Sequence, residues 1–495
     1  MRAIAVTAKT CLAALLAAAM PALTAGCVGS QDAEVSVIAI GSPASPFEKG
    51  ARLPPPAQAL RAATAEGLIG LDEQGQVTPA LADRWIVTDD GLSYIFRLRD
   101  GKWPDGSAIS AESTRNALRQ ALTSLRGTPL SLDLEPIADL RVMASRVIEL
   151  RLSRPQPDLL QLLAQPELGL YYRGRGGGPM RLRRDGDEAM LRVIPPSERG
   201  LPQAEDWQDM VRDVRFRSMP VVKAIAAFDE GEADVVMGGR FVDLNLADRR
   251  GIGKGTLLLD PVSGLFGLVV ISRTGLLADR ENREAVAMAI DRDELGGAIG
   301  PKAWTTQLAV VPAGVGNSDG AENPGWAGID LAERQRQAAA RIAKWRETGG
   351  KTPALRIALP GGPGSDALFA GLTRDLGTTG LAVTRVNEGA PADLRLLDAV
   401  ARYGRSDWYL NQLSCAALKG PCSAAADRLL AEARKAAGEE RNVLLARAEA
   451  ELASENVFIP LGLPIRWTLV RGEPNGLAAN RWAIHPLMPM ARRPK

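Results

Sequence analysis

The sequence predicts an α/β protein with two or three packed lobes, and three observations support this prediction. The chain has 495 residues, of which 46% are hydrophobic and 24% are charged, as is typical of globular proteins large enough for more than one core. Residues 67–120 show the pattern of a β-meander followed by a helix. Residues 354–397 alternate between strand-like and helix-like segments, which is typical of a lobe built on a mixed sheet.

The meander is the most strongly patterned stretch of the chain. Residues 85–87 form a short apolar run, and Asp89-Asp90-Gly91 is a turn signal in which glycine tolerates positive φ. Residues 92–99 alternate apolar and polar side chains with period two, as a half-buried strand does. Ser110 then precedes a helical pattern and is predicted to cap that helix at its N-terminus.

Hydrophobic periodicity also predicts the other helices and strands of the chain. Residues 220–237 indicate a helix followed by a strand. Further strands are expected at 34–40, 147–152, 265–272, 354–359, 381–386, 394–397, 457–461 and 467–471, and helices at 158–165, 283–295, 330–347 and, as a helix pair, 427–454.

Charge and motif content exclude several function classes. The chain has 60 basic and 58 acidic residues and no basic stripe, so nucleic acid is not an expected partner. The glycine run at 176–178 is not followed by Gly-Lys-Ser/Thr, so it predicts a turn rather than a phosphate site. His485 is the one histidine, which leaves no motif for a metal or a serine-histidine triad. A hydrolase that uses two carboxylates stays open as a minor alternative.

The N-terminus and the cysteines indicate export from the cytoplasm. Residues 1–26 combine a positively charged start with a short apolar run, as a secretion signal does. The segment Leu23–Cys27 resembles a bacterial lipobox, which implies acylation of Cys27, with plain signal-peptidase cleavage as the alternative. The expected location is the periplasm or cell envelope. There, Cys415 and Cys422 are predicted to form a disulfide.

Several motifs follow, in order, the pattern of a known family. The matched positions are Pro79-Ala80-Leu81-Ala82 with Trp85, then Asp89-Asp90-Gly91 with Tyr94, Phe96, Leu98, Arg99 and Gly101, then Asp105-Gly106 with Ala111-Glu112. Ser113 departs from the pattern, which usually has Asp there. The chain thus resembles the family-five extracellular solute-binding proteins, which are the dipeptide, oligopeptide and nickel receptors of bacterial ABC importers.

The resemblance implies a two-lobed periplasmic binding protein of type II, with an extra β-rich subdomain in the first lobe and a ligand cleft between the lobes. It implies a monomer that is not an enzyme, needs no cofactor or metal, and delivers a solute to an ABC permease and its ATPase. The expected organisation is a signal peptide (1–26), a lipid-anchor linker with the first strand of lobe I (27–45), the lobe I subdomain (46–172), lobe I (173–262), lobe II (263–470) and a return to lobe I (471–495).

Candidate ligand-binding residues follow from the same resemblance. In peptide-binding relatives, an Asp shortly before the equivalent of Cys415 pairs with the peptide's amino group. That motif is missing here, and the carboxylate position falls near Val400 or Ala401. The candidates are therefore taken from the surrounding loop and from the crossing strand, and they are Asp398, Arg402, Tyr403, Trp408 and Phe266.

Two functions are weighed for this architecture. The first is the solute-binding component of an ABC importer, with a peptide, an opine or sugar derivative, or a metal chelate as the solute. The second is a transport-decoupled receptor or an envelope or chaperone-type binding lipoprotein, which the low aromatic content of 4% keeps open.

Overall fold

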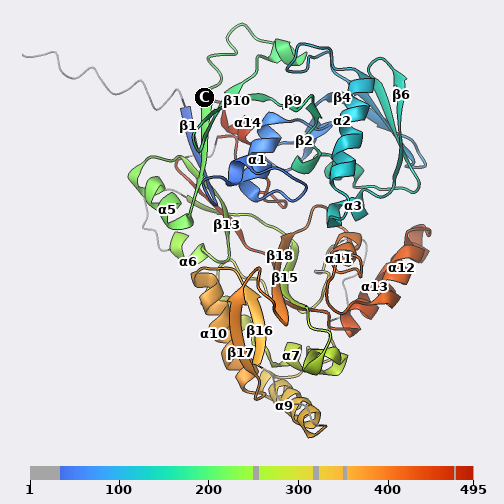
Figure 1. Cartoon of the computed structure of the whole chain (residues 1–495), viewed down its shortest axis with the longest axis vertical. Helices are drawn as coiled ribbons and strands as arrows, with labels where there is room; N and C mark the ends of the chain where they lie inside the picture. The colour runs from blue at the N-terminus through green and yellow to red at the C-terminus, as the bar shows by residue number, and fades with distance from the viewer. Residues whose placement is uncertain (1–33, 249–255, 316–322, 349–353, 473–474, 494–495) are drawn as a thin grey trace, which may run out of the picture.

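The computed structural model describes residues 34–248, 256–315, 323–348, 354–472 and 475–493. Two lobes lie one above the other, and each is built on its own sheet (Figure 1). The predicted signal peptide and Cys27 lie outside the described residues. Among the described residues, none of the helices combines the length and hydrophobicity needed to cross a bilayer.

Lobe I is organised around a seven-stranded mixed sheet. Its strands β1, β12 and β13 pair in parallel, whereas the remaining pairs in the sheet are antiparallel. In spatial order the strands are β10 (Met180–Asp185), β11 (Glu188–Val193), β12 (Asp213–Met219), β1 (Glu34–Ile40), β13 (Val235–Arg240), β20 (Arg466–Val470) and β14 (Thr256–Leu259).

The subdomain of lobe I carries the meander that the sequence predicts. Its antiparallel strands lie in the order β4 (Ala82–Val87), β5 (Ser93–Leu98), β7 (Val147–Leu152) and β6 (Ile137–Ala144). Helix α2 (Ala111–Ser124) begins at the predicted cap: Ser110 accepts a hydrogen bond from the backbone N–H of Ser113, whose side chain accepts one from the backbone N–H of Ser110. This reciprocal arrangement satisfies two N–H groups that an uncapped helix leaves free.

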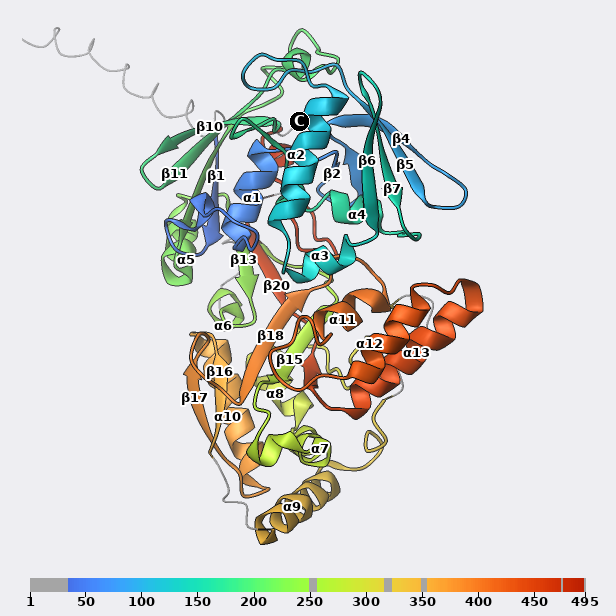
Figure 2. The same ribbon diagram turned by 45° about the vertical axis from the view of Figure 1, so that its right-hand side comes forward.

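Lobe II is built on a five-stranded sheet with helices around it (Figure 2). The strands lie in the order β17 (Ala382–Asn387), β16 (Ala354–Leu359), β18 (Leu394–Val400), β15 (Gly264–Val270) and β19 (Phe458–Gly462). The helices are α7 (Arg280–Ala289), α8 (Arg292–Ile299), α9 (Leu331–Glu347), α10 (Pro363–Gly377), α11 (Ser406–Gln412), α12 (Ala424–Ala433) and α13 (Gly438–Ser454).

Shorter elements complete the two lobes. The helices are α1 (Pro55–Thr64), α3 (Pro129–Asp133), α4 (Leu159–Leu163), α5 (Val221–Glu230), α6 (Leu244–Ala247) and α14 (Leu487–Met490), and the single-turn helix η2 spans Pro166–Leu168. The small strands are β2 (Ile69–Leu71), β3 (Val77–Pro79), β8 (Tyr171–Tyr172) and β9 (Arg175–Gly176).

The chain crosses between the lobes twice. It passes from β14 in lobe I to β15 in lobe II, and it returns from β19 to β20. Strands β14 and β20 pair with each other, with Leu259 opposite Trp467. Lobe II is therefore inserted between two adjacent strands of the lobe I sheet, and both crossings are short.

One predicted helix is wrong. The sequence predicts a single helix at 283–295, but the chain forms α7 and α8 with a break at Ile290, whose backbone is extended (φ −81°, ψ 126°). Asp291 restarts the helix by accepting a hydrogen bond from the backbone N–H of Glu294, while its own N–H donates to Asp375 at 2.9 Å. The apolar pattern continues through the break, which explains why periodicity alone did not reveal it.

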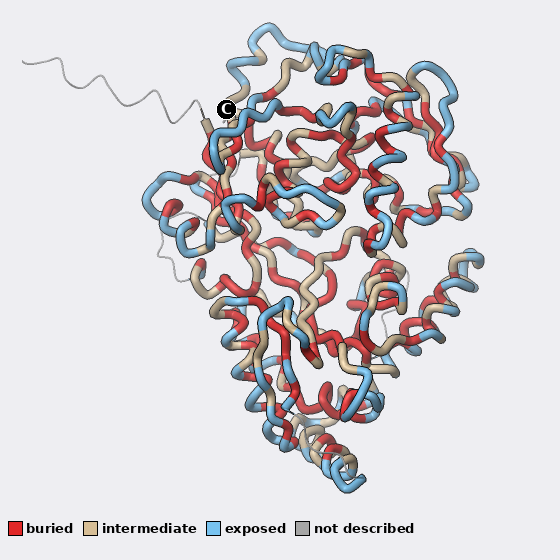
Figure 3. The backbone as a smooth tube through the Cα atoms, viewed as in Figure 1, coloured by how far each residue is buried: buried red, intermediate tan, exposed pale blue. Residues whose placement is uncertain are grey.

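The buried apolar residues form three clusters. One packs against the five-stranded sheet and continues to β1, β13 and α5 of lobe I, and a second lies between α1, α14 and the lobe I sheet. The third begins in the subdomain and continues into lobe II through side chains such as Tyr403, Trp408 and Leu413. Figure 3 shows the buried residues concentrated inside both lobes. The subdomain and lobe II thus share one apolar core, so the structure shows the lobes in close contact.

The glycine run at 176–178 lies against the end of α1. A Cβ atom at Gly178 would lie 2.1 Å from the carbonyl carbon of Thr64 and 2.4 Å from the nitrogen of Ala65. The backbone N–H of Gly178 also donates to the carbonyl of Thr64 at 3.0 Å. Close backbone approach therefore accounts for glycine at this position.

We expect Gly178→Ala to lower the free energy of unfolding by about 2 kcal/mol or more, because backbone atoms of α1 cannot move aside as a side chain can. Urea denaturation followed by circular dichroism measures the change. Gly361→Ala is the matched control, since a Cβ there has no atom within 4 Å, and its effect should stay within about 0.5 kcal/mol. Equal effects of the two substitutions would contradict the packing argument.

Candidate functional site

Asp398 lies where the two sheets meet. Its carboxylate accepts a hydrogen bond from Arg466 at 2.8 Å and lies 3.8 Å from the guanidinium of Arg240. Asp398 is on β18 of lobe II, whereas Arg240 ends β13 and Arg466 begins β20 in lobe I. Its side chain is 5% exposed. The residue predicted to contact ligand thus forms an ion pair between the lobes at the crossing point.

Arg402 also reaches from lobe II to lobe I. It donates two hydrogen bonds to the carboxylate of Glu167, at 2.7 and 3.0 Å, and one to the side-chain oxygen of Gln165 at 2.7 Å. Burial of Glu167 is the largest single effect and opposes its ionisation, but the charge and hydrogen bonds of Arg402, with smaller contributions, together hold the pKa of Glu167 below its ordinary value. This two-point contact is strong because it is charge-assisted.

A buried carboxylate lies beside this pair. The oxygen Oδ1 of Asp133 accepts hydrogen bonds from the hydroxyl of Tyr403 and the side-chain amide of Asn411, both at 2.7 Å. Asp133 ends α3 of lobe I, and its partners come from lobe II. Its other oxygen, Oδ2, is buried without a hydrogen-bond partner among the described residues. Burial raises the pKa of Asp133 to about 6, against the opposing effect of the two hydrogen bonds.

We call these contacts the lobe contact cluster. A further ion pair, between Arg405 of lobe II and Asp158 of lobe I at 2.8 Å, belongs to it. Its members are Asp133, Asp158, Gln165 and Glu167 of lobe I with Arg402, Tyr403, Arg405 and Asn411 of lobe II.

The remaining two candidates from the sequence are buried. Phe266 is 1% exposed and packs edge-on against Phe241 and Trp304, with ring centroids 4.8 and 5.7 Å apart. Trp408 is 2% exposed and packs edge-on against Tyr409. The structure therefore brings Arg402, Tyr403 and Trp408 to the lobe contact, leaves Asp398 at the crossing and places Phe266 in the lobe II core. Their contact with a ligand stays a prediction.

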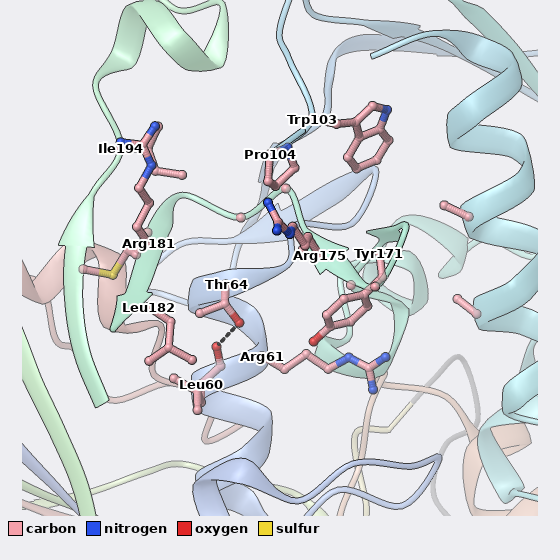
Figure 4. A pocket seen from close by; sticks show the side chains of 18 of the residues that line it. Leu60, Arg61, Thr64, Trp103, Pro104, Tyr171, Arg175, Arg181, Leu182 and Ile194 are labelled. Carbon is pink, nitrogen blue, oxygen red and sulfur yellow. Dashed lines mark hydrogen bonds between the residues drawn. The ribbon is translucent and has the colours of Figure 1, made fainter. Parts of the chain in front are cut away.

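A large cavity lies elsewhere, entirely within lobe I. Its volume is about 1510 Å³, and none of the five candidates lines it. Figure 4 shows the labelled side chains converging on it from α1, from β8 to β10 and from the Trp103-Pro104 turn. The glycines 176–178 form part of its wall. Sequence analysis missed this site although the matched positions Arg99, Gly101 and Gly106 line it, because a sequence pattern does not show which separate segments come together around a cavity.

The cavity wall combines buried apolar side chains with several cationic ones. Trp103, Leu60 and Met180 are buried apolar contributors. Eight lining residues are Arg or Lys and three are Asp or Glu, although the whole chain is nearly balanced in charge. The site therefore has a local positive potential that the overall composition does not reveal.

The histidine does not form a nucleophilic site. The Nε2 atom of His485 lies 3.1 Å from Oδ2 of Asp260, and Nδ1 lies 3.5 Å from the side-chain amide of Asn480. Both ring nitrogens thus face polar groups other than a serine. Across the part of the chain that the structure describes, no three His, Cys, Asp or Glu side chains form a group suited to a metal ion.

The predicted disulfide between Cys415 and Cys422 is present. The sulfur atoms of Cys415 and Cys422 form a disulfide that closes the loop between α11 and α12. The backbone N–H of Cys415 donates to Asp427 at 3.0 Å, which ties this loop to α12.

Comparison with known proteins shows similarity to one family over part of the chain. Residues 76–181 match the family described as bacterial extracellular solute-binding proteins, family 5 Middle. The probable deoxycholate-binding periplasmic protein YgiS of Escherichia coli is 33% identical over 121 residues, which are 21% of this chain and 23% of that protein. The glutathione-binding protein GsiB of Salmonella typhi is 28% identical over 205 residues, 40% of this chain and 36% of that protein. These matches thus span well under half of the relatives' length.

Solved structures show the same fold. The complex of Haemophilus influenzae OppA with RPPGFSPFR aligns with a TM-score of 0.78 at 15% identity, covering 94% of this chain and 99% of that chain. The Escherichia coli murein tripeptide-binding protein MppA aligns with the same TM-score at 17% identity and the same coverage. The predicted two-lobed α/β fold and the predicted resemblance to family five are confirmed. The members of this family are binding proteins rather than enzymes.

The raised pKa of Asp133 predicts a pH dependence of stability. Between its unfolded value of 3.8 and its folded value of about 6, the folded state holds more protons than the unfolded state. Stability therefore falls as the pH rises through this range. From about pH 5 to 7.5 the loss from this group is about 1 kcal/mol.

Asp133→Asn should remove this contribution, so its stability should fall less than that of the wild type over the same range. Urea denaturation at several pH values measures the difference. Asp139→Asn changes a half-exposed carboxylate on β6 and should keep the wild-type slope. An unchanged slope in Asp133→Asn would show that this carboxyl does not titrate as stated.

Proposed function

We propose that this chain, which shares the fold of the family-five extracellular solute-binding proteins and their middle segment at 76–181, captures a small solute between its lobes. It then presents that solute to the permease and ATPase of an ABC importer. The protein acts outside the cytoplasm as a monomer, without catalysis. The N-terminal segment directs export, and Cys27 carries a lipid anchor.

The lobe contact cluster carries this proposal. Only two short crossings join the lobes, and the ion pairs of Arg402 with Glu167 and of Arg405 with Asp158 bridge them. An opening that swings lobe II away from the subdomain would expose these polar groups to water, where charged side chains are well solvated. Such an arrangement supports hinge opening and closing around a solute.

The relatives' names indicate which solutes to test first. The compounds in those names are deoxycholate and glutathione, and the OppA structure holds a peptide. Arg402 is the one candidate of the five that is both polar and more than a quarter exposed, with 27% of its side chain accessible. We propose that it binds an acidic group of the solute once the lobes separate.

Native mass spectrometry of the mature protein from the periplasm tests the function. Bound mass that is released on denaturation would support solute capture and would give the ligand class. The second test is titration with glutathione, trialanine and deoxycholate. An apo mass together with no binding in any titration would favour the alternative, a transport-decoupled receptor or envelope lipoprotein.

We expect Arg402→Met to favour the open arrangement, because it leaves Glu167 buried without its partner. Breaking such a pair costs about 3 kcal/mol, and separation of the lobes lets water solvate the carboxylate. Small-angle X-ray scattering should therefore give a larger radius of gyration than for the wild type.

Two further variants serve as controls for the scattering experiment. Arg356→Met removes an ion pair with Asp393 that lies within lobe II, so it should leave the radius of gyration unchanged. The double variant Arg402→Met with Glu167→Gln removes the unpaired charge and should lie closer to the wild type. The same radius for Arg402→Met and Arg356→Met would rule out the lobe contact as the closing interaction.

A further inference from the structure

We infer that the cavity in lobe I is a second binding site, selective for an amphipathic organic anion, meaning a molecule with an acidic group on an apolar body. This inference goes beyond the proposed solute capture between the lobes. It is carried by the juxtaposition of unpaired cations with an apolar, aromatic wall in one cavity (Figure 4).

The cavity is large, and lobe I alone forms its wall. At about 1510 Å³ the cavity exceeds the range of about 300–1,000 Å³ that most small-molecule sites occupy. Its residues lie between positions 46 and 199, so lobe II contributes no wall to it. The site is therefore complete whether the lobes are open or closed.

The cations in the wall are only partly neutralised. Arg99 and Arg199 share the carboxylate of Glu66, and Arg181 pairs with Glu198. The other five cationic side chains have no ion pair with a carboxylate of the described residues, and they are Lys49, Arg61, Lys102, Arg175 and Arg184. An anion entering the cavity would thus meet cationic side chains that form no ion pair with the described residues.

Arg61 is the best placed of these cations. Its guanidinium lies over the ring of Tyr171, 5.1 Å from the centroid, and its Nε atom is buried without a hydrogen-bond partner among the described residues. Its one hydrogen bond, to the carbonyl of Gly50, is long at 3.4 Å. A buried donor without an acceptor is costly, and a carboxylate or sulfonate oxygen would satisfy it.

Arg175 faces the same space from β9 (Figure 4). Within the described ranges its guanidinium takes part in no hydrogen bond or ion pair, and the residue is exposed. It is therefore free to reorient towards a ligand, and its substitution breaks no contact that the fold uses.

The apolar part of the wall selects for the rest of the molecule. The indole of Trp103 stacks on Tyr172 with ring centroids 5.2 Å apart, and it forms one side of the cavity with Gly177. Leu60 and Ile194 line the cavity across from it (Figure 4). A small inorganic anion would leave this apolar surface wet, whereas an aromatic or aliphatic body would cover it.

A pair of dyes that differ in one sulfonate tests the inference. 1-Anilinonaphthalene-8-sulfonate carries the charge, and N-phenyl-1-naphthylamine is its neutral analogue. Fluorescence titration of the full-length mature protein should show one saturable site at which the sulfonate binds about tenfold more tightly, since a desolvated anion gains charge-assisted hydrogen bonds from arginine.

Substitutions then locate the site. Arg61→Met and Arg175→Met should each weaken sulfonate binding about fivefold while changing binding of the neutral dye less than about twofold. Lys223→Met, which removes an exposed cation on α5 outside the cavity, should change neither. Thermal unfolding of each variant checks that the fold is retained, and Arg175→Met keeps the test valid if Arg61→Met unfolds.

Three results would overturn the inference. They are equal affinity for the two dyes, sulfonate binding that survives both substitutions, and no sulfonate binding at all. Failure here would leave the proposed function intact, because that proposal rests on the lobe contact cluster, which the scattering experiment on Arg402→Met tests independently of this cavity.

Discussion

The relation between the two lobes depends on a single buried carboxylate. Asp398 lies on β18 beside Arg466 and Arg240, which belong to the other sheet. The carboxylate of Asp398 is 5% exposed, and both of its cationic partners lie across the lobe boundary. These contacts join the lobes beside one of the strand crossings, because Arg466 begins β20. The lobe contact cluster joins them at a second place, through α3 and the chain around α11.

The lobe contact combines an apolar core with buried charges. Tyr403 and Trp408 pack with residues of the subdomain, while Asp133 and Glu167 accept hydrogen bonds from lobe II. Burial of apolar surface favours contact between the lobes, but it does not select one relative orientation of them. The charged contacts instead require one geometry, because a misplaced partner would leave a carboxylate buried and unpaired. The combination gives a closed state that is well defined.

Sequence patterns revealed the strands better than the site. β1 and β7 have the predicted bounds, because each is a short run rich in valine, isoleucine and leucine. Helix α1 was missed, since its prolines suggest a loop, although proline suits the first turn of a helix. The cavity could not be found from sequence at all. Trp103, Arg61 and Arg175 meet there only after the glycines 176–178 have allowed the backbone to approach α1, and no local pattern records that approach.

The place of β20 in the lobe I sheet determines when that lobe can finish folding. The strand lies between β13 and β14, yet in the chain it follows the whole of lobe II. Until Arg466–Val470 has arrived, β14 lacks its partner and β13 pairs on one side only. The entropic cost of closing the long loop between β14 and β20 rises only slowly with loop length. Strands that are distant in sequence nevertheless pair slowly. The fold is thus suited to a chain that assembles after it is complete rather than during synthesis, with lobe II able to form first and bring its two ends together.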